Sequence, residues 1–195
     1  MCSWCYAFGE VWSEVQERLP PGVVVRRCLG GLAPDTQAPM PDDMREFLQA
    51  GWRRIESVVP TVRFNFEFWE RCQPRRSTYP SCRAVIAARQ QGVSYDVAMT
   101  RAIQKAYYEL ARNPSDDETL VALAADLGLD ADRFRLALNA PETQAQLKSE
   151  IETADAMGAN GFPSLILQIE TRYRPIPVDY QNAQPMLATI AAALA

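Results

Sequence analysis

Two cysteines separated by two residues, Cys2-Ser3-Trp4-Cys5, open the chain and constrain its fold more than any other feature. Apolar residues follow the pair at helical spacing, so we expect both cysteines on the first turn of a helix. Unpaired N–H groups and the positive end of the helix dipole favour an anion there. The pattern predicts a reactive Cys2 thiolate, with Cys5 one turn behind it and placed to attack a mixed disulfide on Cys2. The apolar positions are Phe8, Val11, Trp12, Val15 and Leu19.

A CxxC pair also forms half of many zinc sites, which is the main alternative to redox chemistry. The remaining cysteines, Cys28, Cys72 and Cys82, are isolated in the sequence, and the chain has no histidine. We therefore expect no metal and no other cofactor. Burial as unreactive thiols is the commoner fate of such cysteines, although Cys72 and Cys82 flank a short segment and could form a second disulfide.

The composition is that of an ordinary soluble globular protein, with 48 % hydrophobic and 23 % charged residues. A net charge of −4 argues against binding to nucleic acid, which calls for a basic stripe. No apolar run approaches the roughly 20 residues that span a bilayer. An odd number of cysteines, five, and a start without a charged and then apolar leader favour a reducing cytoplasm.

In the first third of the chain, helices are expected to alternate with extended segments. Prolines at 20 and 21 end the first helix, and the β-branched residues 23–29 predict a buried strand. Residues 42–60 carry a helical stripe. The alternation of residues 62–68 predicts an extended segment with one aromatic face, which either packs on the core or forms a wall of a hydrophobic substrate groove near Cys2.

The stretch from about residue 78 to residue 157 is predicted to be almost wholly helical. A capping box at residues 115–118 opens the third of five helices, and Asp130 caps the fourth. The predicted helices cover residues 78–92, 95–111, 115–128, 130–138 and 141–157.

An apolar strand over residues 164–169 follows, with residues 171–176 as an antiparallel partner and a last helix over 185–194. We therefore predict an α/β protein. Residues 1–72 and 158–195 form one domain, and residues 73–157 form a helical domain inserted into it.

Three features now coincide: the CxxC pair on a first helix, the all-helical insertion, and Gly161-Phe162-Pro163-Ser164 leading into a strand. Together they resemble the DsbA-like branch of the thioredoxin superfamily, and most closely its FrnE-like thiol oxidoreductases, neighbours of the kappa-class glutathione transferases and hydroxychromene-carboxylate isomerases. The resemblance implies a thioredoxin-like fold. It also implies that Pro163 is cis and lies against the cysteine pair, and that the backbone of Phe162 pairs with a bound substrate.

The resemblance further implies a thiol-disulfide oxidoreductase in which Cys2 attacks and Cys5 resolves. Its partners would be thiol or disulfide substrates, either proteins or small molecules such as glutathione. A glutathione-dependent isomerase or transferase acting on small aromatic compounds stays open as the alternative, although those relatives typically carry serine where Cys2 stands. A binding module without catalysis is a third hypothesis. The residues expected to contact the substrate are Ser3, Trp4, Phe162 and Pro163.

The chain departs from this family at its start, where relatives carry a β-strand that runs into the cysteine pair and lies in the middle of the sheet. Here that first β-strand is missing, which would leave unpaired backbone groups beside the strand at residues 23–29. We therefore expect that Met1 is an internal methionine, or that the strand is supplied from elsewhere. Supply by another copy of the chain would make the protein a homodimer.

Overall fold

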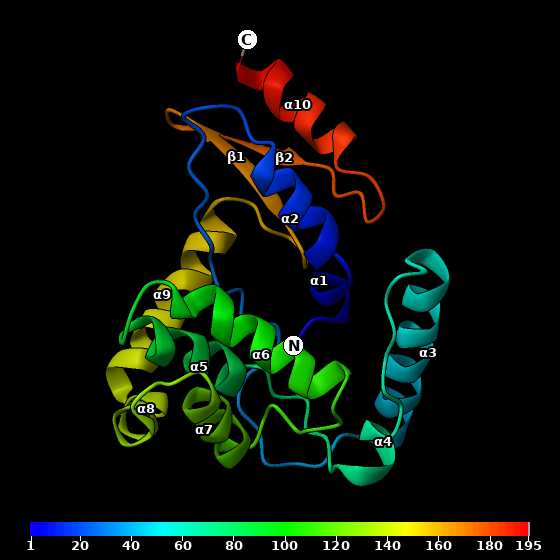
Figure 1. The fold of residues 1–195 in the computed structure, drawn as a ribbon, viewed down its shortest axis with the longest axis vertical. Coiled ribbons are helices and arrows are strands. Elements are labelled where there is room, and N and C mark those ends of the chain that lie inside the picture. The colour runs from blue at the N-terminus through cyan, green and yellow to red at the C-terminus, as the bar shows by residue number, and fades with distance from the viewer. Residues whose placement is uncertain (195) are drawn as a thin grey trace.

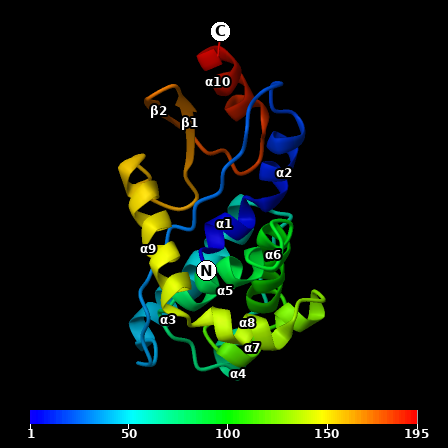
Figure 2. The ribbon, with the colours of Figure 1, turned by 90° about the vertical axis from the view of Figure 1, so that its left-hand side faces the viewer.

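The computed structural model describes residues 1–194, which form ten helices and one two-stranded sheet (Figure 1). Helices α5–α8 gather at one end of the elongated molecule, and the sheet lies at the other end with α2 and α10 (Figure 2). The elements are α1 (Ser3–Ala7), α2 (Gly9–Glu17), α3 (Asp42–Val58), α4 (Phe68–Arg71), α5 (Tyr79–Arg89), α6 (Tyr95–Tyr108), α7 (Asp117–Asp126), α8 (Ala131–Leu138), α9 (Pro141–Ala156), β1 (Leu165–Ile169), β2 (Arg172–Ile176) and α10 (Gln184–Leu194).

The first predicted helix is present as two short helices that meet at Phe8. Cys2 is the N-cap of α1, and its carbonyl accepts a hydrogen bond from the Tyr6 N–H at 3.2 Å. Phe8 ends α1 and precedes the first residue of α2, Gly9. Cys2 and Cys5 therefore lie on the first turn of a helix, as predicted.

Residues 23–29 are extended but belong to no strand in the described part of the chain, so the prediction of a buried strand is wrong. Val24 is 88 % exposed. An extended segment becomes a strand only where a neighbour pairs with its amide and carbonyl groups. Within residues 1–194 the segment is held by side chains instead, through an Arg27–Asp96 ion pair of 2.7 Å and a hydrogen bond of 2.9 Å from the Leu29 N–H to Glu150. A strand supplied from elsewhere stays a prediction.

The extended segment predicted at residues 62–68 joins no strand in the described part of the chain, and its end was predicted wrongly, because residues 66–68 turn into the short helix α4. Its aromatic face is nevertheless buried, with Phe64 and Phe68 only 7 % and 1 % exposed. Phe64 stacks on Trp52 of α3 with 4.8 Å between ring centroids. This face therefore packs on the core, and Phe68 also borders a small cavity beside Met1.

Helices α5–α8 share one apolar core, and α9 packs against α5. The Asp130 side chain accepts a hydrogen bond from the Arg133 N–H at 2.9 Å, so the predicted cap of α8 is confirmed. The predicted capping box of α7 is wrong, because its N-cap is Asp116 and the Ser115 hydroxyl donates to the Ser77 carbonyl instead. The boundaries of the inserted domain stay a prediction.

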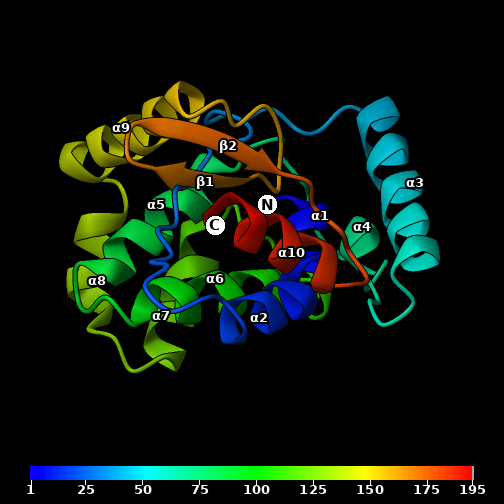
Figure 3. The same cartoon turned by 90° about the horizontal axis from the view of Figure 1, so that it is seen from above.

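The sheet is the antiparallel hairpin predicted near the end of the chain. Leu165 lies opposite Ile176, and Glu170 forms the turn with a φ of 53°. Seen from above, α10 lies between the hairpin and α2 (Figure 3). Val15, Ile176 and Met186 belong to the apolar cluster that joins these three elements.

Candidate active site

The fold brings Cys2 against the loop between α9 and β1. In its protonated form, the Cys2 thiol donates a hydrogen bond to the carbonyl oxygen of Phe162, 160 positions further along the chain, at 3.5 Å. The Phe162–Pro163 peptide bond is cis, and both residues are half-buried. The CxxC pair and the proline loop therefore form one site at the start of α1.

The pKa values of the two thiols are shifted in opposite directions from that of an ordinary cysteine. A hydrogen bond from the Cys5 thiol is the largest effect on Cys2, and backbone N–H groups of α1 add to it, so the pKa of Cys2 falls from 9.0 to about 6 although burial opposes the change. The same hydrogen bond and burial raise the pKa of Cys5 well above its ordinary value. At neutral pH the site holds a thiolate at Cys2 and a thiol at Cys5.

Ser3 and Trp4, the two residues between the cysteines, are half-buried on α1. The Trp4 ring packs on Tyr180, with 4.7 Å between centroids. Tyr6, also on α1, stacks on Tyr108 at 4.6 Å, and its hydroxyl donates to Glu109 at 3.0 Å. The side chains of Trp4 and Tyr6 thus pack α1 against aromatic rings from two distant segments of the chain.

Two tyrosines near the cysteines were not expected from the sequence. Burial, followed by the nearby Cys2 and Cys5 sulfurs, raises the pKa of Tyr180 to about 12. Tyr108 is fully buried, and burial is also the main cause that raises its pKa, with smaller effects of both sulfurs. No local pattern marks either residue, because each reaches the site through the folding of distant segments.

The other three cysteines are free thiols as well, and Cys82 lies close enough to the Met1 amino group to affect its pKa. Burial is the largest cause that raises the pKa of Cys28, Cys72 and Cys82. Cys72 donates a hydrogen bond to the Ala111 carbonyl at 3.1 Å. A second disulfide between Cys72 and Cys82 is absent from the described residues.

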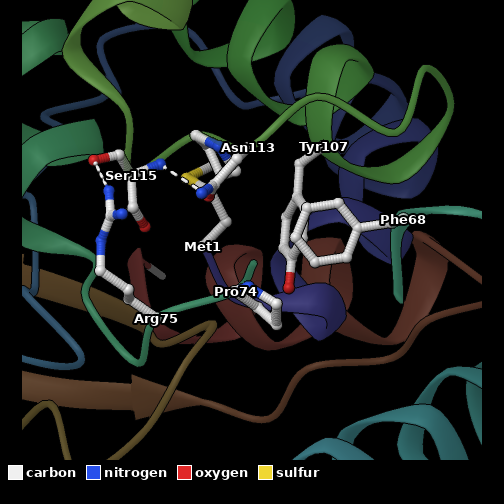
Figure 4. Close-up of a pocket in the computed structure, with 8 residues that line it drawn as sticks. Met1, Phe68, Pro74, Arg75, Tyr107, Asn113 and Ser115 are labelled. Atoms are coloured by element: carbon white, nitrogen blue, oxygen red, sulfur yellow. Dashed lines mark hydrogen bonds between the residues drawn. The ribbon is translucent and has the colours of Figure 1, made fainter. Parts of the chain in front are cut away.

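Two cavities lie close to the helices that carry or adjoin the site. One, of about 20 Å³, lies beside Met1 and is lined by Tyr107, Asn113 and Arg75 among others (Figure 4). It has room for about one water molecule. The other, of about 240 Å³, is lined by residues of α10 and by Arg18 and Pro20 after α2. Neither is lined by a cysteine or by the proline loop.

Two further features, a metal-binding cluster and a membrane-spanning helix, are absent from the described residues. Within residues 1–194, no three His, Cys, Asp or Glu side chains are grouped so that they could hold a metal ion. None of the helices described is long and apolar enough to cross a membrane.

A thiol pair at a helix start, facing a cis-proline loop that leads into an antiparallel hairpin, defines a thioredoxin-like protein, and α5–α9 are its helical insertion. Residues 1–179 match the family model of the DSBA-like thioredoxin domain. The chain belongs to this family.

Similar structures cover the whole chain. A crystal structure from Nitrosomonas europaea, assigned by name to the protein disulfide isomerases, is 23 % identical, with a TM-score of 0.83 over 100 % of this chain and 93 % of that one. The cytosolic disulfide reductase DsbM from Pseudomonas aeruginosa is 24 % identical, with a TM-score of 0.78 over 100 % of this chain and 94 % of that one. Another DsbM structure contains glutathione. These likenesses establish the fold.

One curated relative also matches part of the chain. The ClpXP adapter protein SpxH of Bacillus subtilis is 24 % identical over 121 residues. The match covers 62 % of this chain and 40 % of that relative, so the chain spans well under half of SpxH.

Proposed function

We propose that this protein is a thiol-disulfide oxidoreductase that acts through Cys2 and Cys5. The observation that carries the proposal is the Cys2 sulfur, which receives a hydrogen bond from the Cys5 thiol and lies 3.5 Å from the Phe162 carbonyl oxygen. A thiolate is the nucleophile in disulfide exchange, and a pKa near 6 keeps Cys2 in that form at neutral pH.

In the direction of reduction, the Cys2 thiolate attacks one sulfur of a substrate disulfide, and the other sulfur leaves as a thiolate. Cys5 then loses its proton and attacks the Cys2 sulfur, which releases the second substrate thiol and leaves a Cys2–Cys5 disulfide. The substrate gains two electrons, and the protein loses two. Two molecules of a small thiol such as glutathione return the pair to the dithiol by the reverse exchange.

The proposed substrate contacts are Ser3 and Trp4 beside the sulfur, and Phe162 and Pro163 opposite it. We assign the reducing direction and a cytosolic location because DsbM is named a cytosolic disulfide reductase, and we assign glutathione as a partner because one DsbM structure contains it. Membership of the FrnE-like branch rests on the motifs alone. The proposed homodimer rests on residues 23–29, which are extended and pair with no strand in the described residues.

Reduction of insulin by the wild type, Cys2→Ser and Cys5→Ser proteins tests the proposal. We expect Cys2→Ser to abolish turnover, because the attacking thiolate is gone. Cys5→Ser should accumulate a mixed disulfide with the substrate, detected by mass spectrometry without reductant. Cys28→Ser is the matched control, because Cys28 lies outside the pair.

Retention of turnover by Cys2→Ser would contradict the proposal. Activity that requires glutathione and an aromatic substrate, and that survives this substitution, would favour the isomerase or transferase instead. Absence of any turnover in the wild type would leave a binding module without catalysis as the remaining hypothesis.

A further inference from the structure

We propose that Gly30 is a positioning residue for the cysteine site. Because it has no side chain, the ring of Phe162 can lie on its backbone, and this contact fixes the carbonyl that faces Cys2. The inference rests on the proposed redox function and adds a residue from outside the CxxC pair and the proline loop.

The contact between Gly30 and Phe162 leaves no room for a β-carbon. A Cβ built on Gly30 would lie 1.8 Å from Cε1 and 2.4 Å from Cζ of the Phe162 ring. Gly30 does not have a positive φ, so an alanine at this position would keep an ordinary backbone conformation. The three atoms nearest to such a Cβ all belong to the ring, so the ring is the main reason for glycine here.

The segment beneath the ring is anchored on its other side. The Leu29 N–H donates to Glu150 of α9 at 2.9 Å. A Cβ on Gly31, whose φ is +55°, would lie 2.4 Å from Cδ1 of Ile151 and 2.8 Å from Cε1 of Tyr79. Residues 29–31 are therefore packed against α9 and α5, so a side chain on Gly30 displaces Phe162 and not this segment.

The loop that carries Phe162 has few other anchors. Within the described residues, the Ser164 hydroxyl donates to the Gly161 carbonyl at 2.7 Å, a contact inside the loop. The hydrogen bond that links the loop to α1 is the one from Cys2 to the Phe162 carbonyl. Loss of the ring contact therefore moves the carbonyl relative to the sulfur.

Gly30→Ala should change two measured quantities. Insulin reduction should fall by about tenfold or more, because a displacement of about 1 Å at a reacting centre can cost about a hundredfold. The pKa of Cys2, followed through the pH dependence of its alkylation, should decrease, because the Phe162 carbonyl accepts the S–H of the protonated form. Every variant keeps the other titratable groups around the sulfurs, which are the Met1 amino group, Cys5, Arg27, Tyr108 and Tyr180.

Gly161→Ala is the matched control, because it lies one residue before Phe162 and a Cβ there would meet no atom within 4 Å. The pH dependence of Cys2 alkylation, measured without substrate, should keep its wild-type midpoint in Gly161→Ala, because the contacts of the Phe162 ring are unchanged. An equal shift of the midpoint in Gly161→Ala would overturn the inference, since the loop would then be sensitive to any added methyl group.

A double-mutant cycle with Phe162→Ala isolates the contact. Once the ring is removed, Gly30→Ala should have almost no further effect on turnover or on the titration of Cys2. Equal effects of Gly30→Ala in both backgrounds, or no effect in either, would overturn the inference. If Gly30→Ala alone fails to fold, the double variant with Phe162→Ala should fold, because the clash with the ring is gone; a double variant that also fails to fold would overturn the inference. A wild type without turnover would refute the redox function, while the Cys2 titration would still test Gly30.

Discussion

The helical block of α5–α9 and the cysteine site are held together by contacts of different range. In the block, neighbouring helices bury one another's apolar faces, and Leu120 and Phe134 are completely buried. In the site, Cys2 meets Phe162 across 160 positions of the chain, and Leu29 meets Glu150 across 121. The block can therefore supply stability, while a few individual contacts position the chemistry.

Arginine and carboxylate side chains join the two regions. Arg89 of α5 lies between Asp96 and Glu150, and Asp96 also pairs with Arg27 of the extended segment. Glu150 completes the link through the Leu29 N–H. The following predictions test whether stability and reactivity separate along this boundary.

Phe134→Ala should have the largest effect on stability. A buried phenylalanine replaced by alanine costs about 3–5 kcal/mol, because the apolar contacts are lost and a cavity remains. Urea unfolding measures this loss. The alkylation rate of Cys2 in the folded protein should stay at the wild-type value, and a changed rate would show that the two regions are not separable.

Glu150→Gln should affect both regions, because Glu150 contacts Arg89 and the Leu29 N–H. Loss of a charged partner in a largely buried pair should cost about 2 kcal/mol of unfolding free energy. We also expect a change in the alkylation rate of Cys2, since residues 29–31 lose an anchor. Glu152→Gln, an exposed position on the same helix, is the control and should change neither quantity. A loss of stability without any change in the Cys2 alkylation rate would show that Glu150 does not link the two regions.

Tyr108→Phe should have the smallest effect, and it should stabilise the protein. The Tyr108 hydroxyl is buried without a hydrogen-bond partner in the described residues, and removal of such a group should gain about 1 kcal/mol. Thermal or urea unfolding measures the gain. The stability of Tyr107→Phe provides the comparison, because this substitution also removes a tyrosine hydroxyl but from a residue that lines the small cavity in Figure 4. A loss of stability in Tyr108→Phe would mean that its hydroxyl has a partner.

The sequence predicted what local chemistry determines. Helices α5–α9 follow from apolar spacing and from local signals such as Asp130 and Pro141, which act within a turn of where they occur. Residues 23–29 and 62–68 have the composition of strands, but a strand also requires a neighbour, and none pairs with them in the described residues. The prediction of one aromatic face on residues 62–68 was correct, because burial depends on which side chains are apolar.

The sequence predicted only those residues of the site that belong to recognisable motifs. The CxxC pair was predicted from its spacing and from the helical pattern that follows it. The Phe162–Pro163 segment was found through a family resemblance, and the structure brings the two together. Gly30 and Tyr180 were missed, because their roles depend on which distant segment folds against them. Neither the ring on Gly30 nor the Trp4–Tyr180 contact leaves a periodic or local signal in the sequence.

The central claim is that Cys2 is a thiolate at neutral pH. The most direct measurement is the pH dependence of Cys2 alkylation in the reduced protein, with labelling at Cys2 identified by mass spectrometry. We predict a rate that rises with pH, reaches half its maximum at about pH 6 and is nearly constant above pH 7, because the Cys5 thiol donates to the Cys2 thiolate. A midpoint near the 9.0 of an ordinary thiol would contradict the account.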